Sequence, residues 1–171
     1  LYSKPRFGQL LEGLPRSVVD CHVRALNADK YSKGFRSWDQ LLAMIFAQVS
    51  GVKSLRELET AFNEQKVHHY HLGTQSIKRS TLADANANRD SEIFSKICNG
   101  LMKGVHRKLR QDLGDMLYLL DSTSIHLEGQ GFDDWAGAYR NNVSQGLKLH
   151  IMIEGRQSVP VFLKVTGAQS S

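Results

Sequence analysis

Hydrophobic residues recur every three to four positions through the first 112 residues, the spacing that gathers them on one face of an α-helix. A short apolar piece at 7–14 ends at Pro15. Three serines, Ser37, Ser54 and Ser80, stand where helix N-caps are expected, and the first two have Gln40 and Glu57 in capping-box positions. The pattern predicts a loop at 73–77 and helices over 16–26, 38–50, 55–62, 81–89 and 91–109.

The pattern changes after Gly114. Residues 116–127 form an apolar, partly β-branched run that predicts a buried strand, and residues 129–145 are polar and predict a connecting loop. Apolar and polar residues then alternate over 146–154, which is the period of a strand with two different faces. A turn at 154–158 leads to a third strand at 159–165. We therefore predict an α+β fold, with a helical domain at 1–112 and an incomplete sheet domain at 113–171.

Charge divides along the same boundary. The net charge is +5, but residues 1–112 hold 18 Lys and Arg against 11 Asp and Glu, whereas residues 113–171 hold 4 against 6. A basic domain attracts polyanions such as DNA by releasing counterions. Charge alone is equally compatible with a solvated basic surface.

Neither membrane insertion nor secretion is expected. No apolar run approaches the roughly 18 residues that span a bilayer, and the start of the chain lacks both Met and a signal-peptide pattern. We interpret that start as trimmed. Cys21 and Cys98 lie far apart in apolar-periodic stretches, which favours buried free thiols over a disulfide. We expect a cytoplasmic protein.

Asp121 is the candidate catalytic and metal-binding carboxylate. It lies inside the first predicted strand, where an ionised carboxylate is costly to bury unless it is paired or bound to a cation. Ser122, Thr123 and Ser124 follow directly. Phosphodiester chemistry on DNA uses two divalent ions about 4 Å apart, held by several oxygen ligands. The alternative is an Asp that caps a turn at a strand end.

A basic, amide-bearing helix after the loop at 73–77 is a candidate for DNA recognition. Hydroxyl and basic side chains suit phosphate, and Asn suits adenine, when a helix-turn-helix enters the major groove. The preceding helix carries two further cations. The candidate DNA-binding residues are Arg79, Ser80, Thr81, Asn86 and Arg89, supported by Lys53 and Arg56. The alternative is a polar surface helix packed through Leu82 and Ala85.

Other polar clusters carry weaker signals. The run His68-His69-Tyr70-His71 lacks zinc-ligand spacing, so a polar loop or a DNA-facing patch is the better interpretation. Lys148 and His150 share one strand face, where they would either contact phosphate near Asp121 or decorate an exposed surface. Asp133 and Asp134 are interpreted as surface residues or a turn cap. No phosphate-binding loop and no nucleophile elbow is found.

Short pieces in both parts of the chain match one known family and keep their order along nearly the whole sequence. They lie at 7–11, 14–15, 35–41, 54–58, 70–73, 79–86, Arg89, 120–123, 148–150, Pro160 and 166–168. On these pieces the chain resembles bacterial insertion-sequence transposases of the DDE class, in the large group named after insertion sequence four. Within that group it is similar to the branch with a helical N-terminal domain of undefined role.

The resemblance implies an RNase H-like catalytic core whose Asp-Asp-Glu triad binds Mg²⁺. Only Asp121 can be carried over, as the first Asp; in similar proteins the second follows the piece that corresponds to 166–168, and the Glu lies far downstream. We therefore expect this chain to be catalytically incomplete. The resemblance also implies a bacterial protein that binds transposon ends and target DNA and that cleaves and transfers DNA strands. Such a protein would be associated with the nucleoid when it is bound to DNA.

Two other hypotheses stay open. The chain could be a non-catalytic DNA-binding module, such as a regulator or a transposition inhibitor. It could also serve self-association into a homo-oligomer, through the apolar helix that begins at Trp38. Salt-dependent DNA binding by residues 1–112 favours the first, and the oligomeric state tests the second.

Overall fold

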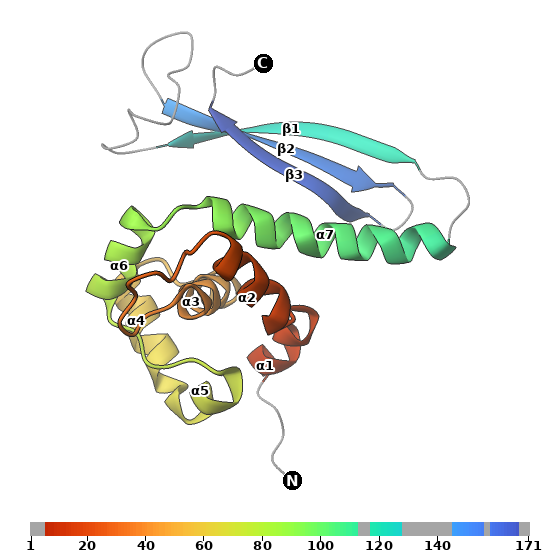
Figure 1. The fold of residues 1–171 in the computed structure, drawn as a ribbon. Helices are drawn as coiled ribbons and strands as arrows, with labels where there is room; N and C mark the ends of the chain where they lie inside the picture. Colours follow the sequence, from red (N-terminus) through yellow and green to blue (C-terminus); the bar gives the residue numbers. More distant parts are fainter. Residues whose placement is uncertain (1–5, 113–116, 128–144, 156–157, 168–171) are drawn as a thin grey trace. The chain divides into compact units, whose positions relative to one another are not determined.

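A computed structural model describes residues 6–112, 117–127, 145–155 and 158–167 of the 171-residue chain. The described part is α+β, with seven α-helices, one 3₁₀ turn and a three-stranded sheet. The helices and the sheet are shown in Figure 1. The chain divides into two compact units, Leu1–Ile97 and Cys98–Ser171. That division falls within the last helix, whereas we had predicted the boundary at its end.

The helices agree closely with the hydrophobic pattern, except for α5 (Lys66–Leu72), which contains the histidine run and was not predicted. All five predicted longer helices begin and end within three residues of their expected bounds, and the first apolar piece is a helix followed by a 3₁₀ turn. The elements are α1 (Arg6–Leu10), η1 (Leu11–Gly13), α2 (Arg16–Ala25), α3 (Ser37–Ser50), α4 (Leu55–Glu64), α5 (Lys66–Leu72), α6 (Arg79–Asn88) and α7 (Glu92–Asp112).

Helix ends follow from specific residues. Ser54 caps α4, because its Oγ accepts a hydrogen bond from the Glu57 N–H at 3.2 Å, as the capping box predicts. The Glu57 carboxylate in turn accepts from the Lys53 N–H at 2.9 Å. Gly51 ends α3 and Gly73 ends α5, both in the left-handed conformation that glycine adopts without steric cost.

Two predicted caps are wrong. Ser37 is the first residue of α3 and is fully buried, so the N-cap is Arg36. The Arg36 N–H donates to the Asp39 carboxylate at 2.9 Å. Ser80 lies inside α6, whose N-cap is Lys78 without a side-chain cap. In both cases the helix begins earlier than its best capping residue, because tertiary contacts override the local preference.

The core of the helical unit is built from α3, α4, α6 and the loop before α6. Figure 1 shows α3 nearly end-on, with α2, α4 and α6 around it. The buried cluster consists of Ala43, Leu58, Phe62, Ile77 and Leu82. Trp38 and Leu42 of α3 are also buried. The apolar face of α3 thus packs within its own unit, so self-association through this helix would have to use its exposed residues, such as Val49.

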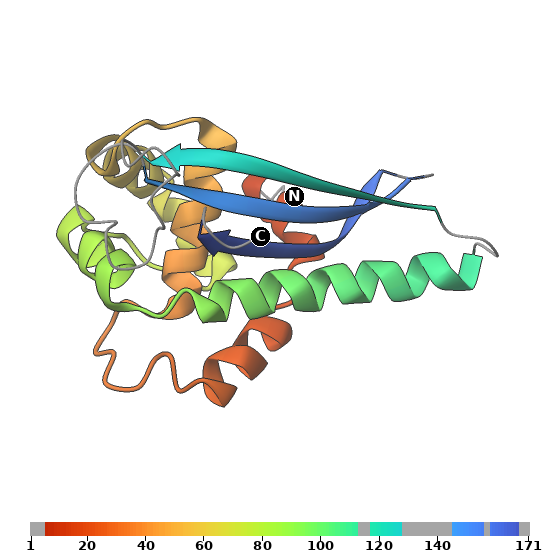
Figure 2. The ribbon, with the colours of Figure 1, turned by 90° about the horizontal axis from the view of Figure 1, so that it is seen from above.

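Three antiparallel strands form the sheet, in the order β1 (Tyr118–Leu127), β2 (Gln145–Glu154) and β3 (Val159–Gly167). They lie side by side in Figure 2. β1 pairs with β2 through Tyr118 opposite Glu154, and β2 pairs with β3 through Glu154 opposite Val159. The three predicted strands are therefore confirmed. The predicted loop at 129–145, with Asp133 and Asp134, lies almost entirely outside the described residues.

The expectation that β1 is buried is wrong. Every residue of β1 except the last is exposed, and Leu119 and Leu120 are 55% and 72% accessible. An apolar run therefore predicted the strand correctly but not its burial.

Two smaller expectations concern cysteines and membranes. Both cysteines are free, as expected, but Cys21 is exposed and Cys98 only half-buried, so the expected burial of both thiols is wrong. Burial raises the pKa of the Cys98 thiol above its ordinary value. Within the described part of the chain, no helix combines the length and apolar character of a membrane span.

Candidate nucleic-acid interface

The first turn of α6 presents the predicted DNA-binding side chains to solvent. Arg79, Ser80 and Thr81 are all exposed, while Leu82, the next residue, is fully buried in the core. Helix N-termini carry unpaired N–H groups and a partial positive charge, which favours phosphate. The position of Leu82 fixes the orientation of this turn, so these three side chains point away from the core.

Asn63 positions the loop that leads into α6. Its side-chain amide donates to the Ile77 carbonyl at 2.8 Å and accepts from the Ile77 N–H at 2.8 Å. Both backbone groups of a buried residue are thereby satisfied by one side chain of α4. Sequence reasoning missed this contact, because nothing local distinguishes Asn63 from any other polar residue on a helix. Lys53, which precedes α4, and Arg56, in its first turn, are both exposed, and their contact with DNA stays a prediction.

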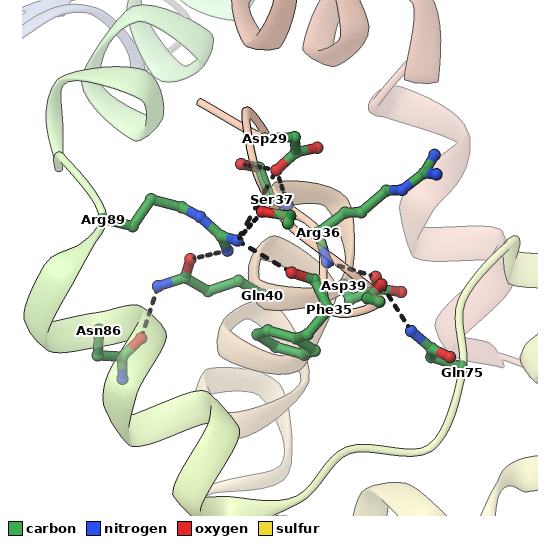
Figure 3. Close-up of polar contacts among 11 residues, drawn as sticks. Asp29, Phe35, Arg36, Ser37, Asp39, Gln40, Gln75, Asn86 and Arg89 are labelled. Carbon is green, nitrogen blue, oxygen red and sulfur yellow. Dashed lines mark hydrogen bonds and ion pairs between the residues drawn. The ribbon is translucent and has the colours of Figure 1, made fainter. Parts of the chain in front are cut away.

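Arg89 is placed differently from the prediction, inside a polar network (Figure 3). Its guanidinium donates to the Gln40 side chain at 2.6 Å and to the Phe35 carbonyl at 3.0 Å, and lies 3.8 Å from the Asp29 carboxylate. Only 10% of its side chain is accessible. Burial lowers the pKa of Arg89, and the charges of Asp29 and Asp39 oppose that change. Arg89 holds the fold together, so the predicted contact with DNA is wrong for this conformation.

Asn86 belongs to the edge of the same network. Its side-chain oxygen accepts from the Gln40 amide at 2.7 Å, as Figure 3 shows. The residue itself is exposed. An adenine contact needs both the oxygen and the amide of Asn, and here the oxygen already has a partner. Recognition of adenine by Asn86 would therefore require Gln40 to release it.

A cleft of about 350 Å³ lies beside the end of α5. The Arg16 guanidinium stacks 5.2 Å from the centre of the Trp38 ring and donates to the Gly73 carbonyl at 3.2 Å. The Trp38 indole donates to the Leu72 carbonyl at 3.0 Å. A Cβ on Gly73 would meet the Arg16 guanidinium, which would have to shift, and the φ of +61° at this position favours glycine in any case. Tyr70 and His71 also line the cleft.

The histidine run is a helix rather than the predicted polar loop. It makes up most of α5, and His69 is buried. The His69 Nε2 lies 3.0 Å from the Phe62 carbonyl, and its ring packs 4.7 Å from the Phe62 ring. His69 is thus a core residue, while His71 and Tyr70 are exposed. The cluster was misjudged because four polar residues in sequence conceal one inward position.

Asp121 lies exposed on β1, and its carboxylate is held by its own strand. One oxygen accepts from the Ser122 N–H at 2.8 Å and the other from the Thr123 hydroxyl at 3.3 Å. The costly burial that first suggested a metal is absent. Among the described residues, no group of three His, Cys, Asp or Glu side chains could hold a metal ion. These residues alone do not form a two-ion site, and Mg²⁺ stays a prediction.

Lys148 and His150 lie on the opposite face of the sheet from Asp121. Asp121 pairs with Ile151, whereas Ser122 pairs with His150 and Ser124 with Lys148. Directly opposed residues share a face, and neighbours along a strand alternate. His150 contacts Thr166 of β3 at 3.0 Å on that second face. The hypothesis that the two residues contact phosphate beside Asp121 is therefore wrong for this sheet, and any other contact with DNA stays a prediction.

Comparison with known families bears on the helical unit. Residues 3–75 match DUF4372, a domain of unknown function. This domain is associated with transposase-like proteins. The match spans α1 to α5 and stops before α6. Comparison with curated proteins and with solved structures finds no match.

Proposed function

We propose that the helical unit binds DNA and that the chain is the N-terminal part of a DDE transposase acting in DNA transposition. The DUF4372 match supports this proposal, because it places a domain associated with transposase-like proteins over α1 to α5. The ordered motifs in both units support it as well. In this proposal the sheet is the start of an RNase H-like domain.

The observation that carries DNA binding is the distribution of charge on the helical unit. Among residues 6–97, every Lys and Arg except Arg89 is exposed. Four carboxylates of the same segment, those of Asp20, Asp29, Asp39 and Glu59, are partly or fully buried. Burial of carboxylates leaves the surface more positive than the composition alone indicates. Such a surface binds the phosphate backbone largely independently of base sequence.

Salt dependence tests this part of the proposal. The 171-residue chain is titrated against a duplex oligonucleotide by fluorescence anisotropy at several salt concentrations. We expect log Kd to rise linearly with log salt, with a slope of about 0.9 for each phosphate neutralised. Absence of binding at low salt would overturn the proposal, and binding without salt dependence would show that the exposed cations do not carry it.

Catalysis is the more distant part of the proposal, and it rests on the resemblance. Asp121 serves as the first carboxylate of the triad, with the second Asp and the Glu supplied by residues that the described part does not contain. The test compares wild type and Asp121→Asn in a protein that carries the complete triad. We expect metal-dependent strand cleavage to be lost and DNA affinity to be kept. Unchanged cleavage would remove Asp121 from the site.

A second candidate function is DNA binding without catalysis, for which the exposed cations of the helical unit suffice. A protein that binds transposon ends without cutting them would act as a regulator or transposition inhibitor. Adding the 171-residue chain to a cleavage reaction of the complete transposase separates the two functions. Inhibition that depends on occupancy of the ends favours the inhibitor, and no effect at saturating concentration counts against it.

A further inference from the structure

The loop at 26–36, between α2 and α3, turns its acidic and apolar residues inward and its cations outward. Asp29, Ser32 and Phe35 are partly buried. The four residues Lys30, Tyr31, Lys33 and Arg36 are exposed. This alternation separates an anchored side from a presented side. None of these four is among the candidate DNA-binding residues that the sequence predicts.

The inward side is fixed by side chains from distant parts of the helical unit. The Asp29 carboxylate accepts from both the N–H and the hydroxyl of Ser37 at 2.7 Å. The Arg89 guanidinium contacts the Asp29 carboxylate and the Phe35 carbonyl, and it also donates to the Ser32 hydroxyl at 3.4 Å. The loop is therefore held in one shape before any partner arrives, which reduces the entropy lost on binding.

A third anchor lies near the far end of the loop. The Gln75 amide donates to the Gly34 carbonyl at 2.9 Å. The Phe35 ring packs against the core cluster and lies 5.9 Å from the Arg89 guanidinium. In Figure 3, the Arg36 side chain extends away from the network formed by Asp29, Ser37 and Arg89. The anchors thus leave the cations free to meet a partner.

Tyr31 of this loop has an unfavourable backbone conformation. Its φ is +69°, a left-handed value that is costly for a bulky residue, and it is 86% exposed. The Lys30 ammonium lies 5.1 Å from the ring centre, and the rest of the ring is open to solvent. An exposed ring contributes nothing to the core, so packing does not explain this strain. Strained backbone of this kind is typical of ligand-binding sites.

We propose that this loop binds DNA at a position where a base is unpaired. In this arrangement Lys30, Lys33 and Arg36 contact phosphates, and the Tyr31 ring stacks on the base. Base–aromatic stacking tolerates any base, and cations beside the ring engage the adjoining backbone. Such positions occur in a single-stranded overhang at the end of a duplex. The inference rests on the proposed DNA binding of the helical unit and names the surface and the DNA structure that it prefers.

The test compares two probes of equal sequence, a blunt duplex and the same duplex with a short single-stranded overhang. Binding of the whole chain is measured by anisotropy at one salt concentration. We expect wild type to prefer the overhang, and Tyr31→Ala to lose that preference by about ten-fold, since stacking is worth about 1–3 kcal/mol per base. Tyr31→Phe should keep the preference, because the ring is retained.

Val67→Ala is the control, because Val67 is 71% exposed on α5 and lies outside the candidate DNA-binding residues. It should bind both probes as wild type does. The double variant Lys30→Gln with Lys33→Gln should weaken binding to both probes and lower the salt slope by about two. Circular dichroism should show all four variants folded, since the residues changed are exposed.

The outcomes distinguish this inference from the proposed function. If wild type binds neither probe, the proposed function fails and the loop inference fails with it. Wild type could instead bind DNA while the Tyr31 and lysine variants bind each probe with the affinity of wild type. That result would overturn the loop inference and leave DNA binding by another surface standing. Loss of overhang preference in Val67→Ala to the same extent would also overturn it.

Discussion

The helical unit buries polar side chains and pairs them, whereas the sheet exposes apolar side chains. Asp39 and Gln40 are 6% and 3% accessible and have hydrogen-bond partners. Leu119 and Leu120 on β1 are mostly exposed. Hydrogen-bonded polar groups can be buried without a large cost, whereas an apolar side chain that is exposed contributes little to stability through burial. We therefore expect side-chain truncations in the core of the helical unit to lower stability more than truncations on β1.

The largest expected effect comes from the core. Leu82→Ala removes a fully buried side chain of α6 and should cost about 3–4 kcal/mol of unfolding free energy. Leu120→Ala removes the same atoms from a position that is 72% accessible, and should cost well under about 1 kcal/mol. Urea unfolding followed by circular dichroism measures both. Equal costs would show that β1 is as well covered as the helical core.

Removal of the Arg89 guanidinium should have the next largest effect. Arg89→Ala leaves the Gln40 oxygen and the Phe35 carbonyl without this donor and the Asp29 carboxylate without its cation, so we expect a loss of about 2–3 kcal/mol. Arg89→Lys should recover only part, because an ammonium cannot reproduce the guanidinium fork. Full recovery by Lys would mean that charge alone matters. Stability is measured as above.

Gly73 should matter more than Gly51, although both have positive φ. Gly73→Ala brings a Cβ against the Arg16 guanidinium, which can shift because it ends a flexible side chain. The cost should therefore exceed only slightly the about 1–2 kcal/mol expected from the backbone conformation. Gly51→Ala has open space around its Cβ and should cost only that conformational amount. Thermal unfolding compares the two, and equal losses would show that the contact between Arg16 and Gly73 is not constraining.

The smallest effect expected is kinetic and concerns the thiols. Because the thiolate is the reactive form, the raised pKa of Cys98 lowers its reactive fraction at neutral pH, and Cys21 is exposed. Iodoacetamide should therefore label Cys21 before Cys98, and Cys98 labelling should accelerate as pH rises. The folded state also holds the Cys98 proton more firmly, so stability should fall slightly as pH rises above the unfolded-state pKa. Equal labelling rates at neutral pH would contradict this difference.

Sequence periodicity predicted most helices and all three strands because both are local properties of the apolar pattern. It did not predict α5, where one inward residue, His69, stands among polar neighbours. It also could not show the anchoring of Asn63 on Ile77 or of Arg89 on Phe35. These pairs are separated by 14 and 54 positions, and the partners in each pair share no local pattern.

The candidate site was predicted in part for the same reason. Arg79, Ser80 and Thr81 are exposed on one turn, as a polar helix start indicates. Arg89 has the same composition signal as Arg79 but lies inward, because tertiary contacts decide which cation meets solvent. Residue type therefore identified the cations, and only the fold separated the structural cation from those available to a ligand.

The most direct test of DNA binding by exposed cations is the salt dependence of DNA affinity in the double variant Arg56→Ala with Arg79→Ala. Both side chains are exposed, so the variant should remain folded. We expect weaker binding and a salt slope lower than that of wild type by about two, one phosphate for each cation removed. An unchanged affinity and slope would contradict the account, because these cations would then not face DNA.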